Sequence, residues 1–383
     1  MKSALLLVAF VPNIVAWTGC KGLHGEPVDW FVVYKPPTPS TSPALFFYAD
    51  ADHSNWTLGS LPIDDTTTAV GATLLAFFFF TSFYHRDQRL FSFAYNDDSP
   101  SGNADSYRWH SKGVVLFDKN SGFWLIHSVP NFPPLGSYSY PPTGLKFGQT
   151  FLCVSIPTRF LGDVGEHLRY VQATPFFSNL PDHFSARFPV LVNIVKKQSL
   201  SKSDTHFTRV GRMTTMKGMP LKSFAKHKKF NRDLWHDLVT AGLGTNMAVE
   251  SWLNGGAEDL HTVCTSKKRV AAPKVFDVTA VALPGVTFNS SRDHSKWAIS
   301  GPEDERATVC VGDLNRQKSQ LRRGGGALCF QHRGLWRTLH DSVKSVQSCV
   351  SKKVHSYVDY ALLPILCIVL EHSGSQSVYS STD

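Results

Sequence analysis

The stretches HSKGVVLFDKNSGFWLIHS (residues 110–128) and HSKWAISGPEDERATVCV (residues 294–311) decide the fold. Each begins with His-Ser-Lys, continues as a short apolar run, passes through a polar turn and returns as a second apolar run. Apolar runs of this length separated by turn residues are typical of β-hairpins. The repetition predicts a pseudo-dimer, in which two similar halves each contain one such hairpin.

The sequence around the hairpins mixes strand and helix patterns. VDWFVVYK (28–35) and the apolar run at 151–155 predict strands. Residues 69–84 are uncharged and contain four consecutive phenylalanines, which favours a buried helix. Residues 224–243 have apolar side chains at helical spacing and predict a second helix. We therefore expect an α/β (mixed α+β) fold, with each half a β-sheet flanked by helices.

The composition indicates a folded, basic protein. The chain has 383 residues, 42% of them hydrophobic, and a formal net charge of +9. That apolar fraction suits a globular core and argues against a disordered chain. A basic excess fits a polyanionic partner such as nucleic acid or an anionic membrane surface.

The chain divides into a leader, two halves and a tail. Residues 1–16 read as a signal peptide, because Lys2 precedes a compact apolar run and small residues near Ala16. We assign 17–185 to the first half, 186–350 to the second and 351–383 to a C-terminal tail. A signal peptide places the protein in the secretory pathway.

Two apolar segments raise the question of membrane insertion. Both 69–84 and 360–370 are uncharged, but both fall short of the ~20 residues that a spanning helix needs. We expect no stable membrane span. The second segment is interpreted as a docked tail or a weak membrane-surface segment.

Secretion bears on the cysteines and on two glycosylation acceptors. Disulfides are plausible in an exported chain, and seven cysteines leave at least one outside an intrachain pair. No C-x-x-C pair suggests a zinc site. The sequons beginning at Asn55 and Asn289 are acceptors for N-linked glycans.

The hairpins also gather chemistry-bearing side chains. Alternate residues of a strand share a face, so the histidine and lysine of each His-Ser-Lys point the same way. The returning strand ends beside the start of the outgoing one and adds further polar groups. The first set is His110, Lys112, His127 and Asn131, and the second is His294, Lys296, Asp313 and Asn315. For His127, functional and structural roles are equally weighted.

These sets suit phosphodiester cleavage. Histidine can act as nucleophile or general acid, lysine neutralises phosphate, and an asparagine amide can donate to a phosphoryl oxygen. Two sets facing one phosphorus allow in-line attack through a phosphohistidine. Which histidine attacks is left open. A third H-x-K, at His227, lies in a basic stretch that we interpret as a solvated or DNA-facing charge cluster.

The chain resembles the deoxyribonuclease II family, whose fold is similar to that of the phospholipase D superfamily. The resemblance runs from about Gly25 to Cys349. It is carried by EPVDWFVVYK (26–35), HSKGVVLFD (110–118), GFWLIHSVPNFPP (122–134), GQTFLCVS (148–155), LGTN (243–246), FNSSRDHSKW (288–297), CVGDLNR (310–316) and RGGGALC (323–329). It implies an acid-active endonuclease that cuts double-stranded DNA without metal or another cofactor, leaving 3′-phosphate and 5′-hydroxyl ends, in a secreted or lysosomal location.

The resemblance also implies roles for individual residues. His110, Lys112, His294 and Lys296 match the two catalytic H-x-K motifs, and His127, Asn131, Asp313 and Asn315 fall in the flanking motifs. The implied disulfides are Cys20–Cys153, Cys264–Cys349 and Cys310–Cys329, with Cys367 outside this set. Monomer and homodimer both remain open.

Two other classes of function compete with this interpretation. A catalytically weak or inactive secreted binding or effector protein of the same family would be indicated by a missing catalytic histidine, and both histidine–lysine pairs are present. A phospholipase or phosphatidyl transferase shares the H-x-K logic but not the other motifs.

Overall fold

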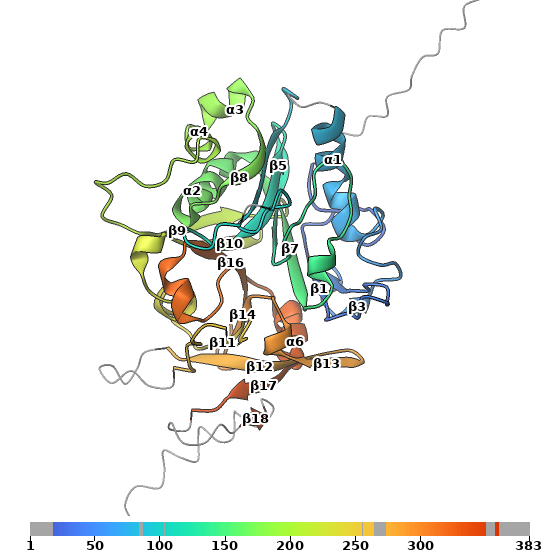
Figure 1. The fold of residues 1–383 in the computed structure, drawn as a ribbon, viewed down its shortest axis with the longest axis vertical. Coiled ribbons are helices and arrows are strands. Elements are labelled where there is room, and N and C mark those ends of the chain that lie inside the picture. The colour runs from blue at the N-terminus through green and yellow to red at the C-terminus, as the bar shows by residue number, and fades with distance from the viewer. Residues whose placement is uncertain are drawn as a thin grey trace, which may run out of the picture.

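Two large β-sheets form the body of the protein in the computed structural model (Figure 1). The structure describes residues 18–83, 87–102, 104–254, 256–263, 273–349 and 357–359. The predicted signal peptide, Cys264, Cys367 and the apolar segment 360–370 lie outside the described residues. The prediction of a mixed α/β fold with two halves is confirmed.

The first sheet has eight strands in the order β3-β2-β1-β7-β6-β5-β4-β8. Its strands are β1 (Trp30–Lys35), β2 (Phe47–Asp50), β3 (Thr57–Leu58), β4 (Phe91–Asn96), β5 (Lys112–Phe117), β6 (Ser121–His127), β7 (Gln149–Pro157) and β8 (Pro175–Asn179).

The second sheet has the order β18-β17-β12-β11-β14-β15-β16-β10-β9, and β13 pairs with β12. Its strands are β9 (Thr208–Thr214), β10 (Pro220–Lys226), β11 (Met247–Glu250), β12 (Val275–Leu283), β13 (Val286–Asn289), β14 (Trp297–Ser300), β15 (Thr308–Gly312), β16 (Gly325–Gln331), β17 (Val343–Gln347) and β18 (Tyr357–Asp359).

Helices are few and mostly short. The α-helices are α1 (Ala69–Phe83), α2 (Leu161–Val171), α3 (Asp182–Arg187), α4 (Val190–Val195), α5 (Ala241–Leu243) and α6 (Arg333–Ser342). The 3-10 helices are η1 (Pro142–Gly144), η2 (Thr158–Phe160), η3 (Lys228–Phe230), η5 (Ser290–Arg292) and η6 (Lys318–Arg322), and η4 (Trp235–Thr240) is a π-helix.

Both predicted hairpins form where the repeat indicated. The first is β5–β6 and the second is β14–β15, and each is antiparallel. In both halves a third antiparallel strand continues the hairpin, β7 beside β6 and β16 beside β15. The next strand is β1 in the first sheet and β10 in the second, so the central strands follow one order in both halves.

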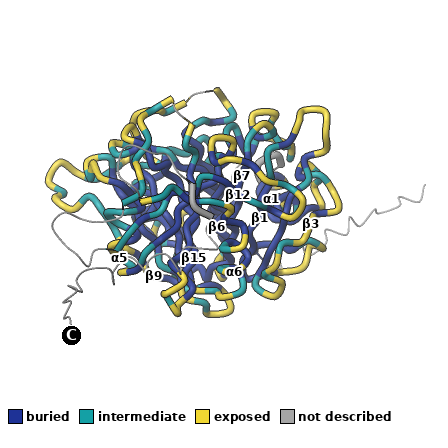
Figure 2. Tube along the Cα trace, turned by 90° about the horizontal axis from the view of Figure 1, so that it is seen from below, coloured by how far each residue is buried: buried dark blue, intermediate teal, exposed yellow. Residues whose placement is uncertain are grey.

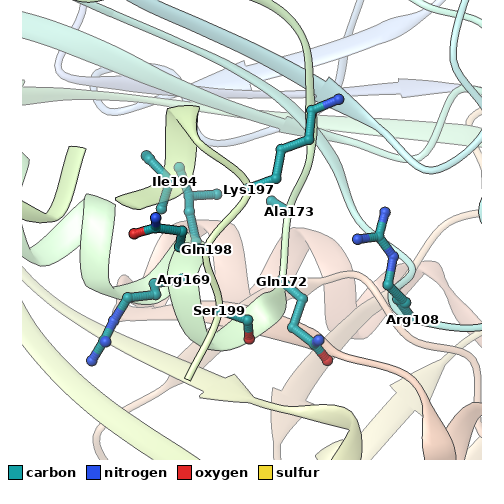
Figure 3. A pocket seen from close by; sticks show the side chains of 9 residues that line it. Arg108, Arg169, Gln172, Ala173, Ile194, Lys197, Gln198 and Ser199 are labelled. Atoms are coloured by element: carbon teal, nitrogen blue, oxygen red, sulfur yellow. The ribbon is translucent and has the colours of Figure 1, made fainter. Parts of the chain in front are cut away.

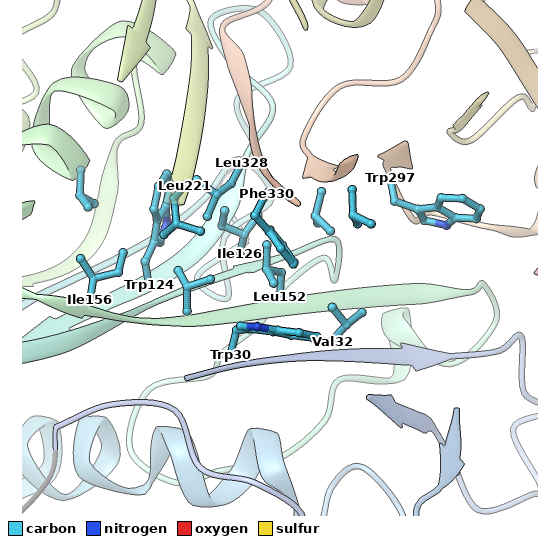
Figure 4. Packing of buried hydrophobic residues seen from close by; sticks show 14 of the residues in the cluster. Trp30, Val32, Trp124, Ile126, Leu152, Ile156, Leu221, Trp297, Leu328 and Phe330 are labelled. Atoms are coloured by element: carbon cyan, nitrogen blue, oxygen red, sulfur yellow. The ribbon is translucent and has the colours of Figure 1, made fainter. Parts of the chain in front are cut away.

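The largest core lies between the two sheets. Strand residues alternate between faces, and in β1 Trp30 and Val32 turn toward this core while Phe31 and Val33 turn away from it. Figure 4 shows Trp30 of the first sheet packed below Phe330 of the second, with ring centroids 5.3 Å apart. This shared core fixes the two halves against each other. In Figure 2 the buried trace is concentrated in the middle of the molecule and the exposed segments lie at its rim.

The outer face of each sheet has its own cover. Helix α1 packs Val70, Leu74 and Phe77 into the cluster on the outer face of the first sheet. The uncharged Phe-rich segment is therefore a largely buried helix, as predicted, although Leu75 remains 57% exposed. On the second sheet, Trp235 of η4 packs into an equivalent outer cluster of buried apolar side chains.

The helix predicted over residues 224–243 is wrong in its first half. Phe224 lies in strand β10, opposite Val210 of β9 on one side and Ala327 of β16 on the other. The short 3-10 helix η3 follows at Lys228–Phe230, and the longer helical stretch begins at Leu234. The apolar spacing misled because Phe224, as a strand residue, is buried in the same outer cluster as Leu234 and Trp235 of the helical stretch.

Two of the implied disulfides are present, Cys20–Cys153 and Cys310–Cys329. The third implied pair involves Cys264, which lies outside the described residues. The acceptors Asn55 and Asn289 are both exposed. In the described part of the chain, no helix combines the length and apolar character needed to cross a membrane.

Candidate active site

The two His-Ser-Lys segments meet where the halves join. The backbone N–H of His110 donates to the carbonyl of Gly324, and that of His294 donates to the carbonyl of Gly148, each at 2.9 Å. Each histidine thus hydrogen-bonds the loop that precedes the third hairpin strand of the other half. Both acceptors are glycines because a Cβ would lie 2.4 Å from Asp293 Oδ1 at Gly148 and 2.1 Å from the Val171 carbonyl at Gly324.

His110 has polar neighbours. Its Nδ1 lies 2.9 Å from Gln320 Oε1, and its Nε2 lies 4.0 Å from Asp97 Oδ2. An amide oxygen can only accept, so Nδ1 donates and Nε2 is turned toward the site. Burial, followed by the charges of Lys112, Arg323 and Lys296, holds the pKa of His110 well below its usual range.

His294 has aromatic neighbours instead. Its ring stacks on Phe147 with centroids 4.2 Å apart and an interplanar angle of 12°, and the Trp252 ring lies 4.3 Å away. Its Nε2 is buried without a hydrogen-bond partner among the described residues. Burial, and then the charges of Lys296, Lys112 and Lys35, lowers the pKa of His294 to about 2.

The two lysines bring the halves into electrostatic contact. Lys112 forms an ion pair with Asp97, which also accepts from Arg323 at 3.1 Å, and Lys296 Nζ donates to the His294 carbonyl at 2.6 Å. Burial and then the charge of Lys112 lower the pKa of Lys296 to about 7. Like charges from two sheets therefore converge on one volume, which favours an anion between them.

Of the two flanking residues of the second half, Asp313 lies within electrostatic reach of both site lysines. Asp313 accepts from the Gly326 N–H at 2.8 Å, and burial raises the pKa of its carboxyl to about 7. Asn315 is buried, and its Oδ1 has no hydrogen-bond partner in the part of the chain that the structure describes. The Gly326 contact thus holds the Asp313 carboxylate, while Asp313 Oδ1 is also buried without a hydrogen-bond partner among the described residues.

The flanking residues of the first half are placed differently. His127 lies between Phe132 and Phe151, its Nδ1 accepts from the Val129 N–H at 3.2 Å, and burial followed by the charge of Lys112 lowers its pKa. Asn131 adopts a positive φ of 56° and donates to Asp98 Oδ1 at 3.1 Å. It therefore binds the loop at Asp98 and Ser99, and among the described residues it has no hydrogen bond to the histidine–lysine pair.

Several site residues escaped the sequence argument. Asp97 belongs to no recognisable motif. Gln320 and Arg323 lie more than 200 residues along the chain from His110, which they approach in the fold. Phe147 and Trp252 likewise approach His294 only through the fold. The one usable signal was the pair of glycine-containing segments GQTFLCVS and RGGGALC, which introduce the third strands of the two hairpins.

Two other features, a third H-x-K histidine and a small pocket, are separate from the paired His-Ser-Lys segments. His227, the histidine of the third H-x-K, caps η3 by accepting from the Lys229 N–H and contacts Ser199 Oγ at 3.1 Å. A small basic pocket is lined by Arg108, Leu168, Arg169, Gln172, Ala173, Ile194, Lys197, Gln198 and Ser199 (Figure 3). Among the described residues, no group of three or more histidine, cysteine, aspartate or glutamate side chains is arranged to hold a metal ion.

Comparison with known proteins gives a consistent result. The sequence model of the deoxyribonuclease II family matches residues 19–349. The chain is 49% identical to cell-death-related nuclease 7 of Caenorhabditis elegans over 87% of this chain and 88% of that one. It is 37% identical to deoxyribonuclease-2-alpha of Sus scrofa (91% and 95%) and 32% identical to plancitoxin-1 of Acanthaster planci (90% and 96%). The chain belongs to the deoxyribonuclease II family.

Proposed function

We propose that this nuclease hydrolyses double-stranded DNA at acidic pH without a metal ion, through a phosphohistidine, leaving 3′-phosphate and 5′-hydroxyl ends. The observation that carries the proposal is the meeting of the two histidine–lysine pairs, one from each sheet, with mutually repelling lysines. A phosphodiester bound between them would offset that repulsion.

The reaction divides into two displacements. In the first, the neutral ring of one histidine forms a bond to phosphorus while the 5′-oxygen leaves and takes a proton from the other histidine. In the second, the histidine that lost its proton accepts one from water, which attacks phosphorus and releases the 3′-phosphate from the first ring. Protons balance over the cycle, and both histidines return to their starting states.

Fixed cations stabilise the charge that develops on the phosphoryl oxygens. Lys112, Lys296 and Arg323 are all held near the two histidines by backbone or carboxylate contacts. Charges held in place before the substrate arrives need little reorganisation during the reaction, which is the main source of electrostatic catalysis. They supply the positive charge that Mg²⁺ provides in metal-dependent nucleases.

The same cations support an acid-side optimum. One histidine must be protonated before leaving-group departure, yet burial and neighbouring cations lower the pKa of both His110 and His294. At neutral pH the free site holds two neutral imidazoles. Acidic solution and the bound phosphate anion both favour adding the one proton that the reaction needs.

The expected setting follows from the first residues and the family. A secretory leader, two disulfides and two exposed glycan acceptors support a secreted or lysosomal destination. An acidic compartment would act together with the bound phosphate to favour the protonated histidine that the reaction needs. Within the chain, we propose 17–185 and 186–350 as the two halves that each contribute one histidine–lysine pair.

Plasmid nicking tests the proposal. Supercoiled DNA is incubated with the protein from pH 4 to pH 9, in EDTA and in Mg²⁺, and the ends are analysed by polymerase extension before and after phosphatase treatment. We expect a bell-shaped profile with an acidic maximum in EDTA, and extension only after phosphatase. An absolute need for Mg²⁺, an alkaline maximum or directly extendable ends would contradict the mechanism, and DNA binding without cleavage would indicate an inactive binding protein.

A further inference from the structure

Two fully buried lysines occupy equivalent positions in the halves. Lys35 ends β1 and pairs with Gln149 of β7, while Lys226 ends β10 and pairs with Gly325 of β16. Both side chains are 0% exposed. Each lysine therefore lies at the end of the strand that borders the third hairpin strand of its own half, although neither belongs to an H-x-K motif.

These lysines bind backbone carbonyls rather than carboxylates. Lys35 Nζ donates to the Pro36 carbonyl at 2.8 Å and to the Leu145 carbonyl at 2.7 Å. Lys226 Nζ donates to the Gln320 carbonyl at 3.3 Å and to the Leu321 carbonyl at 2.8 Å. Burying an ammonium is costly unless it is well hydrogen-bonded. Burial lowers the pKa to about 7 for Lys35 and to about 8 for Lys226, which reflects that cost.

The Leu145 carbonyl bound by Lys35 and both carbonyls bound by Lys226 lie in the two loops that hold the histidines, whereas Pro36 directly follows Lys35 itself. Leu145 is three residues before Gly148, whose carbonyl accepts from the His294 N–H, and Phe147 between them stacks on the His294 ring. Leu321 is likewise three residues before Gly324, whose carbonyl accepts from the His110 N–H. Gln320, whose backbone binds Lys226, contacts His110 Nδ1 with its side chain.

We propose that Lys35 is a positioning residue for His294 and that Lys226 is a positioning residue for His110, each acting through the loop that reaches the opposite half. The proposal rests on the proposed function, since it assigns both histidines to one reaction. It means that the orientation of each histidine is controlled by a buried ammonium in the half to which that histidine does not belong.

Kinetics of Lys35→Met and Lys226→Met give the first test. A misplacement of about 1 Å in a catalytic group can lower the rate by about 100-fold, so we expect kcat to fall roughly 10- to 100-fold with KM nearly unchanged. Lys222→Met is the matched control, because Lys222 lies on the same strand as Lys226 and donates to the Gly242 carbonyl, away from the site. An equal loss of kcat in Lys222→Met would overturn the proposal.

Imidazole nitrogen NMR gives a second test that does not depend on cleavage. With histidine labelled by ¹⁵N, Lys226→Met should move the ring resonances of His110 and leave those of His294, and Lys35→Arg should move His294 and leave His110. Arginine keeps the charge of Lys35, which itself lowers the pKa of His294, so the shift reports the loop and not the lost charge.

The crossed pattern of shifts decides the question. Shifts in the histidine of the same half, in both histidines together or in neither would overturn the positioning roles. If a methionine variant fails to fold, Lys226→Arg and Lys35→Arg provide the same comparison with the hydrogen-bond donors retained. If wild-type protein does not cleave DNA but the crossed shifts appear, the proposed function fails and the cross-half control stands.

Discussion

The surroundings of His110 and His294 differ, although each residue is the first of an identical His-Ser-Lys tripeptide. His110 is oriented by a hydrogen bond to Gln320 and faces Asp97, whereas His294 is packed against Phe147 and Trp252. A hydrogen bond fixes which ring nitrogen carries the proton, while aromatic packing fixes the ring plane and removes water. The repeat therefore supplies the same side chain twice, and the surrounding loops give the two rings different environments.

Removing either ring should have the largest effect. His110→Ala and His294→Ala should each lower DNA cleavage by at least ~10² to 10⁴-fold, the range typical for loss of a general acid or base. The measurement is plasmid nicking at the acidic optimum in EDTA. His227→Ala is the control, because it removes an H-x-K histidine that contacts Ser199 instead of the site. A nearly active His294→Ala would mean that the two rings do not share one reaction.

Placing a carboxylate beside His110 should show which role that ring has. Gln320→Glu puts a negative charge near Nδ1, which favours the protonated ring and should raise the pKa of His110. If His110 is the nucleophile, the acidic limb of the pH–rate profile moves to higher pH, and if His110 is the acid, the alkaline limb moves. The exposed Gln198→Glu is the charge-matched control. Two unmoved limbs would exclude control of His110 by Gln320.

Loss of the stacked ring should have a smaller effect on His294. Phe147→Leu keeps an apolar side chain but removes an aromatic contact, and such contacts are worth about 0.5–1.5 kcal/mol, or roughly 2- to 10-fold in rate. The loss should appear in kcat measured by single-turnover cleavage. Phe79→Leu, in the partly exposed stretch of α1, should leave the rate unchanged. A wild-type rate for Phe147→Leu would show that packing does not orient His294.

The smallest effect on activity should come from substitution of the buried His167. His167 packs against Trp124 with ring centroids 4.8 Å apart, and burial lowers its pKa to about 3. Because the unfolded ring titrates near ~6.5, the unfolded state binds more protons below that pH and stability is lost as pH falls from ~6.5 toward 3. Each pH unit in this window costs about 1.4 kcal/mol for one such ring.

His167→Leu removes that proton-linked term. The Tm of the variant should therefore fall less than that of the wild type between pH 7 and pH 4, with little change in kcat, and differential scanning calorimetry measures both curves. Parallel curves would mean that His167 is not held neutral by the fold. His167→Leu should change the pH dependence of Tm, whereas His110→Ala and His294→Ala should change DNA cleavage. Measuring both quantities separates acid sensitivity of the fold from acid dependence of the reaction.

The individual strands and helix α1 could be predicted from the sequence, but the contacts between the two halves could not. Strand periodicity located β5 and the β14–β15 hairpin, and an uncharged apolar segment located α1. Local patterns cannot report that Gln320 reaches His110 or that Phe147 reaches His294, because those contacts exist only after two sheets have packed. The misassigned stretch from Phe224 shows the same limit, since burial of that side chain is set by neighbouring strands.

The residues just before Gly148 and Gly324 occupy equivalent positions in the two halves but differ in chemistry. Phe147 stacks on the His294 ring, and the corresponding Arg323 pairs with Asp97, which lies beside His110. In a dimer of identical subunits, any substitution at this position would be inherited by both sides at once. A single chain carrying both copies frees each from that constraint, so the position beside His294 can carry an aromatic ring while the position beside His110 carries a charge.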